Sequence, residues 1–252
     1  MLCPRAALFD LDDTLAESFH PPAPETLEGL KRLLDLMPVA IVTGAGFARM
    51  EAQFLPALAA SPHADRLYIF PGSSAQGYAY SDGLWKRLYS VGFTEEDQRR
   101  ITRTIQEVVD DMPALKAVPH YGQQLFEREE QIAYTPVGID ASADTKKNWD
   151  PQGSKRTRLW NVLKEKLPEF EILMGGQTTI DITPKGIDKS HGVTWLSAHL
   201  HIPPEEMLYV GDALYEGGND AVVIPTGIET RSVEGPADTL RVMQEIIAAC
   251  AA

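Results

Sequence analysis

Ala6-Ala7-Leu8-Phe9-Asp10-Leu11-Asp12-Asp13-Thr14-Leu15 decides the fold, because a short apolar run ends there in three carboxylates. Such a run predicts a buried strand of a parallel sheet, and open α/β sheets place their chemistry at the carboxyl ends of these strands. Asp10 and Asp12 suit nucleophilic attack by one carboxylate and acid–base catalysis by another. The stretch by itself also fits a plain strand followed by an Asp-rich turn. A calcium loop fits poorly, since Leu15 stands where that motif has glycine.

A second strand is expected soon after the first. Apolar residues repeat with helical spacing from Leu27 to Met37, Pro38 ends this helix, and Val39-Ala40-Ile41-Val42 leads into Thr43-Gly44. This order makes a βαβ unit with two parallel, neighbouring strands, so Thr43 should lie near Asp10. A hydroxyl at this place could bind a phosphate oxygen, although Thr43 fits equally well as the N-cap of the next helix.

The last third of the chain contains another apolar strand that ends in a carboxylate. Met207-Leu208-Tyr209-Val210-Gly211 precedes Asp212, and the following loop carries Asn219-Asp220 before a further strand predicted over 221–224. Lys189 begins the helix before this strand, and alone it fits a solvated lysine. If the core strands are parallel, one sheet edge collects the side chains of Asp10, Asp12, Thr43, Lys189, Asp212, Asn219 and Asp220.

Crowded carboxylates at this edge would need a cation and a lysine beside them. Oxygen ligands without a Cys or His partner favour Mg²⁺ among the common metal ions.

The composition is that of an ordinary globular chain of 252 residues, with 44% hydrophobic and 23% charged residues. A net charge of −13 argues against nucleic acid as a partner, because nucleic acid favours a basic surface. No apolar stretch of about 18 residues indicates a membrane span, and no signal peptide is recognisable. Cys3 and Cys250 are the only cysteines and stand far apart in the sequence, so we expect reduced thiols in a cytoplasmic protein.

The middle of the chain differs from its two ends. Strand-like runs pair into hairpins there, the first around Ser81-Asp82-Gly83, and amphipathic helices are predicted after Thr94 and around Leu159. Hairpins combined with helices indicate an inserted α+β domain. We therefore expect a Rossmann-like α/β core with a parallel sheet, formed by residues 1–80 and 187–252, and an inserted domain over residues 81–186.

Four motifs in order resemble those of the haloacid dehalogenase (HAD) superfamily of phosphotransferases. They are Asp10-Leu11-Asp12-Asp13-Thr14, Thr43, Lys189, and Gly211-Asp212 with Asn219-Asp220. The resemblance implies that Asp10 is the nucleophile, which becomes an aspartyl phosphate, and that Asp12 is the general acid and base. An acid at position 12 points to phosphatase or mutase chemistry rather than to a dehalogenase or an ion pump.

The same resemblance implies a ligand set. The carboxylates of Asp10 and Asp212 and the backbone carbonyl of Asp12 would hold Mg²⁺. Thr43, Gly44 and Lys189 would bind the transferring phosphoryl group. Asn219 and Asp220 would support the metal and the lysine.

The long insertion between Thr43 and Lys189 is similar to the C2B cap of branch IIB of the superfamily, which closes over the substrate. Within this branch the chain resembles eukaryotic-type phosphomannomutases, through segments that include Gly175-Gly176-Gln177-Thr178-Thr179-Ile180-Asp181. Phe126-Glu127-Arg128 and Tyr134-Thr135-Pro136-Val137-Gly138 resemble that family's substrate-binding hairpin. Arg128 and Thr179 would, by this resemblance, bind the distal end of a sugar phosphate.

The chain also departs from the mutases. Ile139 stands where they carry an arginine, Lys116 is the only basic residue near Ala117, where another is expected, and their register would put the hydroxyl of the second motif at Ala45. Weaker anion binding in the cap would let water accept the phosphoryl group.

We therefore expect a Mg²⁺-dependent phosphatase that acts on a sugar phosphate or a similar small phosphomonoester, with phosphomannomutase as the alternative. A non-catalytic sugar-phosphate sensor is a third reading, but it has no need for a paired nucleophile and acid. The cap could also expose the face of a homodimer.

Overall fold

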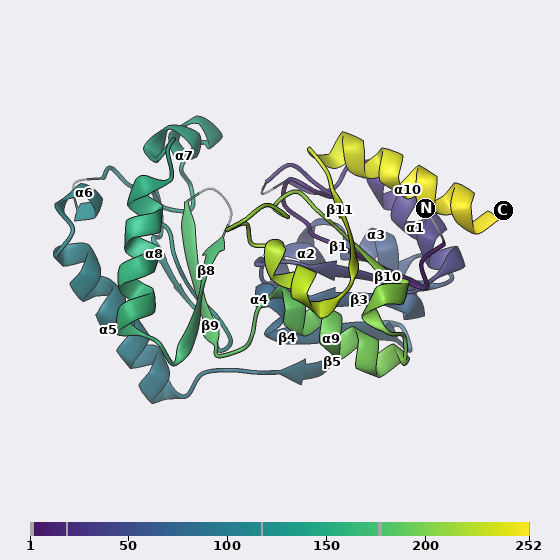
Figure 1. Cartoon of the computed structure of the whole chain (residues 1–252), viewed down its shortest axis with the longest axis horizontal. Helices are drawn as coiled ribbons and strands as arrows, with labels where there is room; N and C mark the ends of the chain where they lie inside the picture. Colours follow the sequence, from purple (N-terminus) through teal and green to yellow (C-terminus); the bar gives the residue numbers. More distant parts are fainter. Residues whose placement is uncertain (1–2, 19, 117, 176–177, 252) are drawn as a thin grey trace. The chain divides into compact units, whose positions relative to one another are not determined.

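The computed structural model describes residues 3–18, 20–116, 118–175 and 178–251. The chain folds into two compact units (Figure 1). We call the unit formed by Met1–Ser90 and Asp188–Ala252 the core, and the unit formed by Val91–Ile187 the cap. The chain thus leaves the core once, builds the cap and returns.

A seven-stranded sheet forms the centre of the described core, in the order β11-β10-β1-β2-β3-β4-β5. Its parallel strands are β1 (Ala6–Phe9), β2 (Val39–Val42), β3 (Leu67–Phe70), β10 (Met207–Gly211) and β11 (Glu229–Ser232). All but β11 are buried along their whole length, as is usual for parallel strands covered on both faces. Because β1 lies between β10 and β2, the polar residues that follow these three strands meet at one edge.

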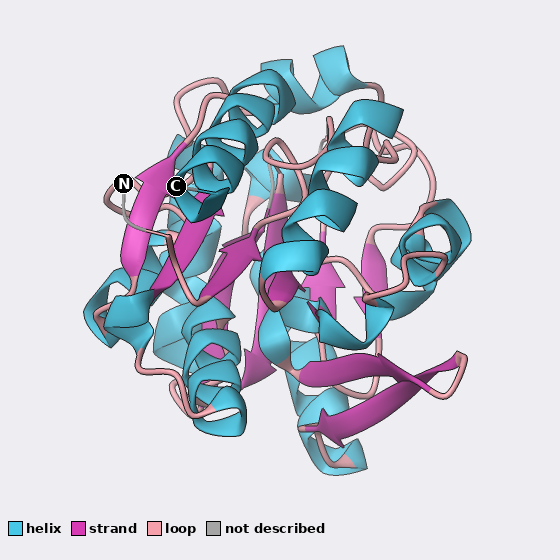
Figure 2. Cartoon of the chain, turned by 90° about the vertical axis from the view of Figure 1, so that its right-hand side faces the viewer, coloured by secondary structure: helices cyan, strands magenta, loops and turns pink. Residues whose placement is uncertain are grey.

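Helices cover both faces of this sheet (Figure 2). Phe9 packs on one face, in the cluster that includes α1 (Pro24–Leu36), α2 (Phe47–Gln53), α3 (Leu55–Ala59) and α10 (Pro236–Ala251). Leu8 points to the opposite face, where α9 (Lys189–Leu200) and the 3-10 helix η3 (Ala221–Thr226) lie. Short helical segments complete the core: η1 (Ala64–Arg66), α4 (Pro71–Ser74) and η2 (Pro204–Glu206). Successive side chains of β1 thus point to opposite faces of the sheet, and each face has its own hydrophobic cluster.

The hairpin of β4 (Gln76–Ser81) and β5 (Leu84–Ser90) belongs to the core. The sequence places the first domain boundary between residues 80 and 81, inside this hairpin. In the structure β4 pairs with β3 through Tyr68↔Ala79 and Ile69↔Tyr78, and β5 pairs with β4, so the hairpin extends the core sheet. The units divide after Ser90 instead, and again after Ile187.

The segment 221–224 was predicted as a strand, and this prediction was wrong. The backbone N–H groups of Ala221 and Val223 donate to the carbonyls of Gly218 and Asp220, which winds the segment into η3. The strand at this edge of the sheet is β11, which begins at Glu229.

The cap is an α+β unit with its own hydrophobic cluster. Its described strands form a four-stranded antiparallel sheet in the order β6-β7-β9-β8: β6 (Leu125–Glu127), β7 (Ile132–Tyr134), β9 (Thr179–Pro184) and β8 (Phe170–Gly175). The helices are α5 (Glu95–Asp110), α6 (Pro113–Lys116), α7 (Ala143–Trp149) and α8 (Ser154–Lys166). Figure 1 shows α5 and α8 side by side along the sheet, and their apolar residues pack against it.

Cys3 and Cys250 form a disulfide, with their Cα atoms 4.8 Å apart. The prediction of reduced thiols was therefore wrong in this structure. It rested on the separation of the two residues in the sequence, but α10 packs beside α1 and brings Cys250 back to the residues that precede β1. Among the described helices, none combines the length and the apolar character needed to cross a bilayer.

Candidate active site

The site forms where β1, β2 and β10 end and α9 begins. Asp10 follows β1 directly, and its backbone N–H donates to the carbonyl of Val210 on the neighbouring strand at 2.9 Å. Lys189 is the first residue of α9, and Asp188 caps that helix by accepting from the N–H of Ser190 at 2.8 Å. This N-cap contact of Asp188 fixes where α9 starts, and Lys189 therefore lies at the same sheet edge as Asp10.

Lys189 joins two buried carboxylates. Its Nζ lies 2.7 Å from Oδ1 of Asp10 and 2.7 Å from Oδ1 of Asp220. The three side chains are only 3%, 6% and 0% exposed, respectively, so the contacts are little screened by solvent. This buried triad is the strongest electrostatic feature of the described core.

Asp220 is held in place from several sides. Oδ1 also accepts from the hydroxyl of Tyr209 at 2.6 Å, and Oδ2 accepts from the N–H of Ala213 at 3.0 Å. A Cβ at position 211 would lie 2.4 Å from Oδ2, which explains why a glycine ends β10 there. The structure thus uses Asp220 to orient Lys189, and leaves Asn219 half-buried in the loop beside it.

Asp212 completes a group of three carboxylates. The hydroxyl of Thr14 donates to Oδ1 of Asp212 at 3.2 Å and accepts from its backbone N–H at 3.0 Å. Oxygen atoms of Asp10, Asp212 and Asp220 all lie within 4.8 Å of one another. One lysine for three carboxylates leaves negative charge uncompensated, and hard oxygen donors suit Mg²⁺, so these residues fit a divalent cation.

Burial and mutual repulsion change the acidity of these groups. Burial raises the pKa of Asp10 well above its ordinary value, against the opposing effect of Lys189, and Asp220 and Asp212 raise it further. Burial also raises the pKa of Asp212, and Asp220 adds to this. Burial disfavours the charged form of Lys189, but Asp10 and Asp220 outweigh it and raise the pKa of the ammonium. The lysine therefore stays charged, and a cation at the carboxylates would favour the ionised, nucleophilic form of Asp10.

Asp12 is engaged by an arginine that the sequence did not single out. Nη1 and Nη2 of Arg49 lie 2.9 and 2.7 Å from the two carboxylate oxygens of Asp12. Arg49 belongs to α2, and its Nε donates to Oε1 of Gln53 one turn later at 3.3 Å. In this arrangement both oxygens of the expected acid–base group are bound to one guanidinium.

Thr43 lies at the carboxyl end of β2 and is almost fully buried. Its hydroxyl oxygen accepts from the N–H of Ala45 at 3.0 Å, and its carbonyl accepts from Ser73 at 2.8 Å. The alternative, Thr43 as the N-cap of the next helix, was wrong, because Gly46 is the N-cap residue of α2. The contact with Ala45 stabilises the turn after β2 instead. It leaves the hydroxyl hydrogen able to bond a phosphate oxygen, and Gly44 follows in the same half-buried loop.

Arg128 and Thr179 stand at different places on the cap sheet. Arg128 lies in the turn between β6 and β7, where its guanidinium donates to the side chain of Gln131. Thr179 begins β9, beyond the pair Tyr134↔Ile180 at the other end of the ladder. The three residues of β7 separate these two places, which corresponds to about 10 Å along the strand. The two residues therefore lie near opposite ends of β7.

A buried lysine of the cap was missed from the sequence. Lys146 of α7 places its Nζ 2.8 Å from the carbonyl of Ile139, next to the position where the mutase-like arginine was expected. Burial lowers the pKa of Lys146, and Asp140 opposes this. Asp181 of β9 is also buried, close to Gly175. Lys146 and Lys147 form a lysine pair in a polar segment, which gives no sequence signal that would separate Lys146 from a surface residue. Asp181 ends the segment from Gly175 that carries the family resemblance.

Residues 26–249 match the family model of the eukaryotic phosphomannomutases. The chain belongs to the eukaryotic phosphomannomutase family. A phosphomannomutase of Spinacia oleracea is 27% identical over 250 residues, which cover 95% of this chain and 94% of the relative. Phosphomannomutase 2 of Dictyostelium discoideum is 25% identical over 251 residues and covers 94% of each chain. The family lies within the HAD superfamily, so the chain is an enzyme of that superfamily.

Solved structures share the fold of this phosphomannomutase-family chain. The IMP-bound, N-terminally truncated IMP-nucleotidase of Plasmodium falciparum aligns with a TM-score of 0.73 and 16% identity, over 97% of this chain and 68% of that one. The C-terminal domain of trehalose-6-phosphate phosphatase of C. albicans aligns with a TM-score of 0.67 and 16% identity, over 98% and 93%. The α/β core with an inserted α+β unit is thus confirmed as the HAD arrangement.

Proposed function

We propose that this protein is a Mg²⁺-dependent phosphotransferase that acts on a hexose phosphate, with the phosphomannomutase reaction as its activity. The observation that carries the proposal is the buried triad of Asp10, Lys189 and Asp220. A carboxylate that merely stabilised the fold would not need a fixed ammonium beside it and a third acid, Asp212, within metal-binding reach.

In the proposed reaction, an oxygen of Asp10 attacks the phosphorus of a hexose bisphosphate. The bond between phosphorus and the sugar oxygen breaks, and Asp12 gives that oxygen a proton. A hydroxyl of the acceptor hexose phosphate then returns its proton to Asp12 and attacks the aspartyl phosphate, which frees Asp10. Lys189 offsets the negative charge at Asp10 in both steps, and Thr43 would donate to a phosphoryl oxygen.

Asp10, Asp212 and the backbone of Asp12 would hold the cation, with Asp220 beside them. When bound, Mg²⁺ supplies positive charge for the phosphoryl oxygens and favours the ionised form of Asp10.

The family match and one contact in the cap support mutase activity over hydrolysis. The phosphatase reading rested on missing cations in the cap, above all at Ile139. Lys146 now supplies an ammonium at 2.8 Å from the carbonyl of that residue. A mutase must hold a doubly phosphorylated intermediate, and the ammonium of Lys146 adds positive charge to the part of the cap around Ile139.

A phosphatase of sugar phosphates is the second candidate. The side chain of Ile139 favours this second candidate. It is 37% exposed and offers no hydrogen bond to a phosphate, whereas an arginine at this position would offer two parallel N–H donors.

The test is an assay of mannose 1-phosphate with Mg²⁺ and a catalytic amount of hexose bisphosphate. Mannose 6-phosphate as the main product supports the mutase, and free phosphate as the main product supports the phosphatase. Neither product from folded protein over a broad panel of sugar phosphates would refute both. Asp10→Asn serves as the control, because it keeps the size of the side chain and should abolish turnover without unfolding the protein.

Cytoplasmic location and a homodimer formed through the cap stay predictions from the sequence.

A further inference from the structure

A small hollow in the cap lies beside an unpaired indole donor. The side chain of Trp149 is 7% exposed, and its Nε1 has no hydrogen-bond partner among the residues that the structure describes. Buried N–H groups without a partner are rare, since each loses its bonds to water without replacement. Trp160 in the same unit shows the usual solution, because its Nε1 donates to the carbonyl of Ile172 at 2.7 Å. The Trp149 donor therefore calls for an acceptor that the described residues do not supply.

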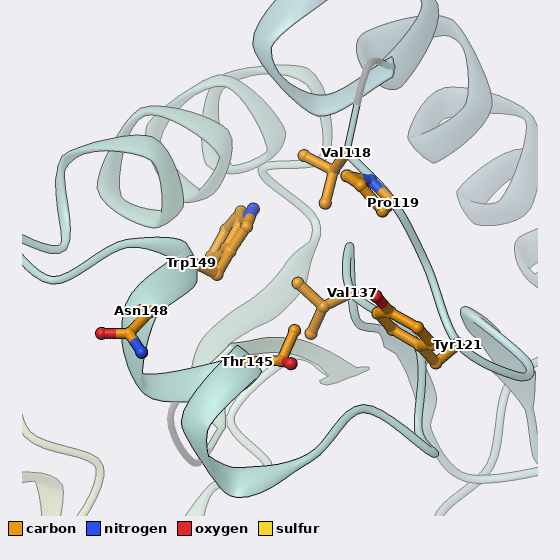
Figure 3. Close-up of a pocket in the computed structure, with 7 residues that line it drawn as sticks. All are labelled: Val118, Pro119, Tyr121, Val137, Thr145, Asn148 and Trp149. Carbon is orange, nitrogen blue, oxygen red and sulfur yellow. The ribbon is translucent and has the colours of Figure 1, made fainter.

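The hollow next to this donor has a volume of about 250 Å³. Figure 3 shows the indole of Trp149 on one side and Val118 with Pro119 on the other, with the indole nitrogen on the ring edge toward Val118. Val137 lies between them and is buried. The aromatic face and these three apolar side chains form walls that would contact an apolar body.

The size of the hollow limits its occupant. A dry cavity of roughly 150 Å³ is enough for benzene, whereas drug-sized ligands occupy roughly 300 Å³ or more. About 250 Å³ thus holds one ring and a short substituent, and because the hollow is open on one side, these would be the atoms of a ligand that it buries. One α7 face presents the polar groups at the rim, because Thr145, Asn148 and Trp149 follow helical spacing.

The chemistry of the lining limits it further. None of the described residues that line the hollow is Asp, Glu, Lys, Arg or His. Lys155 lies outside it, with its ammonium 5.7 Å from the centre of the Trp149 ring and bonded to the Trp149 carbonyl at 2.7 Å, which disfavours a cationic occupant. An anion would find no charge-neutralising group among the lining residues.

From these features we infer that the cap binds a small uncharged ring compound through this hollow, with an acceptor oxygen of the ligand bonded to Nε1–H of Trp149. None of the lining residues is assigned to phosphoryl transfer, although Val137 belongs to the segment that resembles a substrate-binding hairpin, and occupancy of the hollow does not depend on the proposed reaction. It provides a place in the cap where a neutral effector can bind.

The test uses acetophenone as the probe. Ethylbenzene is the matched compound that lacks the acceptor oxygen, and benzoate is the matched compound that carries a charge. Spectra of the full ¹⁵N-labelled protein follow the indole N–H signals, which Trp149→Phe and Trp160→Phe assign. Acetophenone should shift the Trp149 signal saturably, with a dissociation constant of about 1–10 mM, and leave the Trp160 signal in place. Ethylbenzene should bind about threefold to tenfold more weakly, since it makes no hydrogen bond.

Val118→Phe gives an independent check that does not remove the core tryptophan. A phenyl group from the half-buried position 118 would fill the hollow and should weaken acetophenone binding at least about tenfold, in protein shown to be folded by its thermal transition. The inference is overturned by the absence of a saturable Trp149 shift, by equal shifts of both indoles, or by an unchanged affinity in Val118→Phe. Benzoate binding as tightly as acetophenone, or ethylbenzene doing so, would overturn the assigned ligand class.

Discussion

Arg49→Met should shorten the lifetime of the phosphorylated enzyme. Both oxygens of Asp12 are bound to the guanidinium of Arg49, so the expected base is not available to activate water until this ion pair opens. Methionine keeps most of the length and apolar volume of the arginine stem but removes the fork. Asp12 would then lack this bidentate contact, including when no sugar is bound.

The size of the effect follows from the exposure of the pair. The side chains of Arg49 and Asp12 are 21% and 27% exposed, so solvent screens the contact considerably. Exposed ion pairs contribute up to about 1 kcal/mol, and a bidentate geometry places this pair near the top of that range. A difference of about 1 kcal/mol changes the population of Asp12 that is released from Arg49 about fivefold, and the hydrolysis rate of the aspartyl phosphate by the same factor.

The assay loads the enzyme with labelled phosphate from a hexose bisphosphate, removes the sugar and follows protein-bound label over time. We expect loss of label to be about fivefold faster in Arg49→Met, and Arg49→Lys to fall between the two, since lysine keeps the charge without the fork. Arg66→Met is the matched control, because Arg66 bonds the backbone carbonyls of Leu34 and Asp35. An equal or longer lifetime in Arg49→Met would refute the reasoning about Arg49 alone. Failure of the wild type to take up label would refute the proposed function instead.

Three further predictions concern stability. Lys189→Met leaves two buried carboxylates without their cation and should cost about 3–5 kcal/mol of unfolding free energy at pH 7.5. The loss should shrink toward pH 5. Lys189 lowers the pKa of Asp10, so this pKa rises further in the variant, and Asp10 loses its buried charge by taking up a proton as the pH falls. Urea unfolding that shows the same loss at both pH values would contradict this. Mg²⁺ at about 100 times its dissociation constant should stabilise the protein by about 2.7 kcal/mol, or about 5–10 °C in Tm, and Asp212→Asn should lose most of that gain in a thermal-shift assay. Burial lowers the pKa of His191, so the stability that its neutral form contributes is present above pH 6.5 and is lost as the pH falls below that value. If the slope of Tm against pH is unchanged in His191→Phe, His191 is not the source of this pH dependence.

The core of the site was predictable because it depends on local patterns. Four apolar residues before Asp10, and the helix between Leu27 and Met37, were enough to predict parallel strands and the meeting of Thr43 with Asp10 at one sheet edge. The capped start of α9 brings Lys189 to the same place, and its spacing from Asp188 is visible in the sequence.

Features that depend on contacts between distant elements were not predictable. The pairing of Arg49 with Asp12 requires a long side chain to reach from α2 to the loop after β1, and nothing in the residue pattern of α2 marks it. The hairpin of β4 and β5 reads the same whether it extends the core sheet or starts the cap, since only its pairing with β3 decides. Lys146 likewise became recognisable only through its contact with Ile139.

The disulfide between Cys3 and Cys250 changes the connectivity of the molecule. By sequence alone, the two segments of the core are linked only through the cap, so a single cut in either connecting segment would leave a nicked chain in two pieces. The disulfide spans 247 positions and turns the chain into a covalent ring, in which the core segments are also joined directly. One proteolytic cut beside Ser90 would therefore open the ring without releasing a fragment. A second cut beside Ile187 would release the cap and leave the two core segments as one covalent molecule until the bond is reduced.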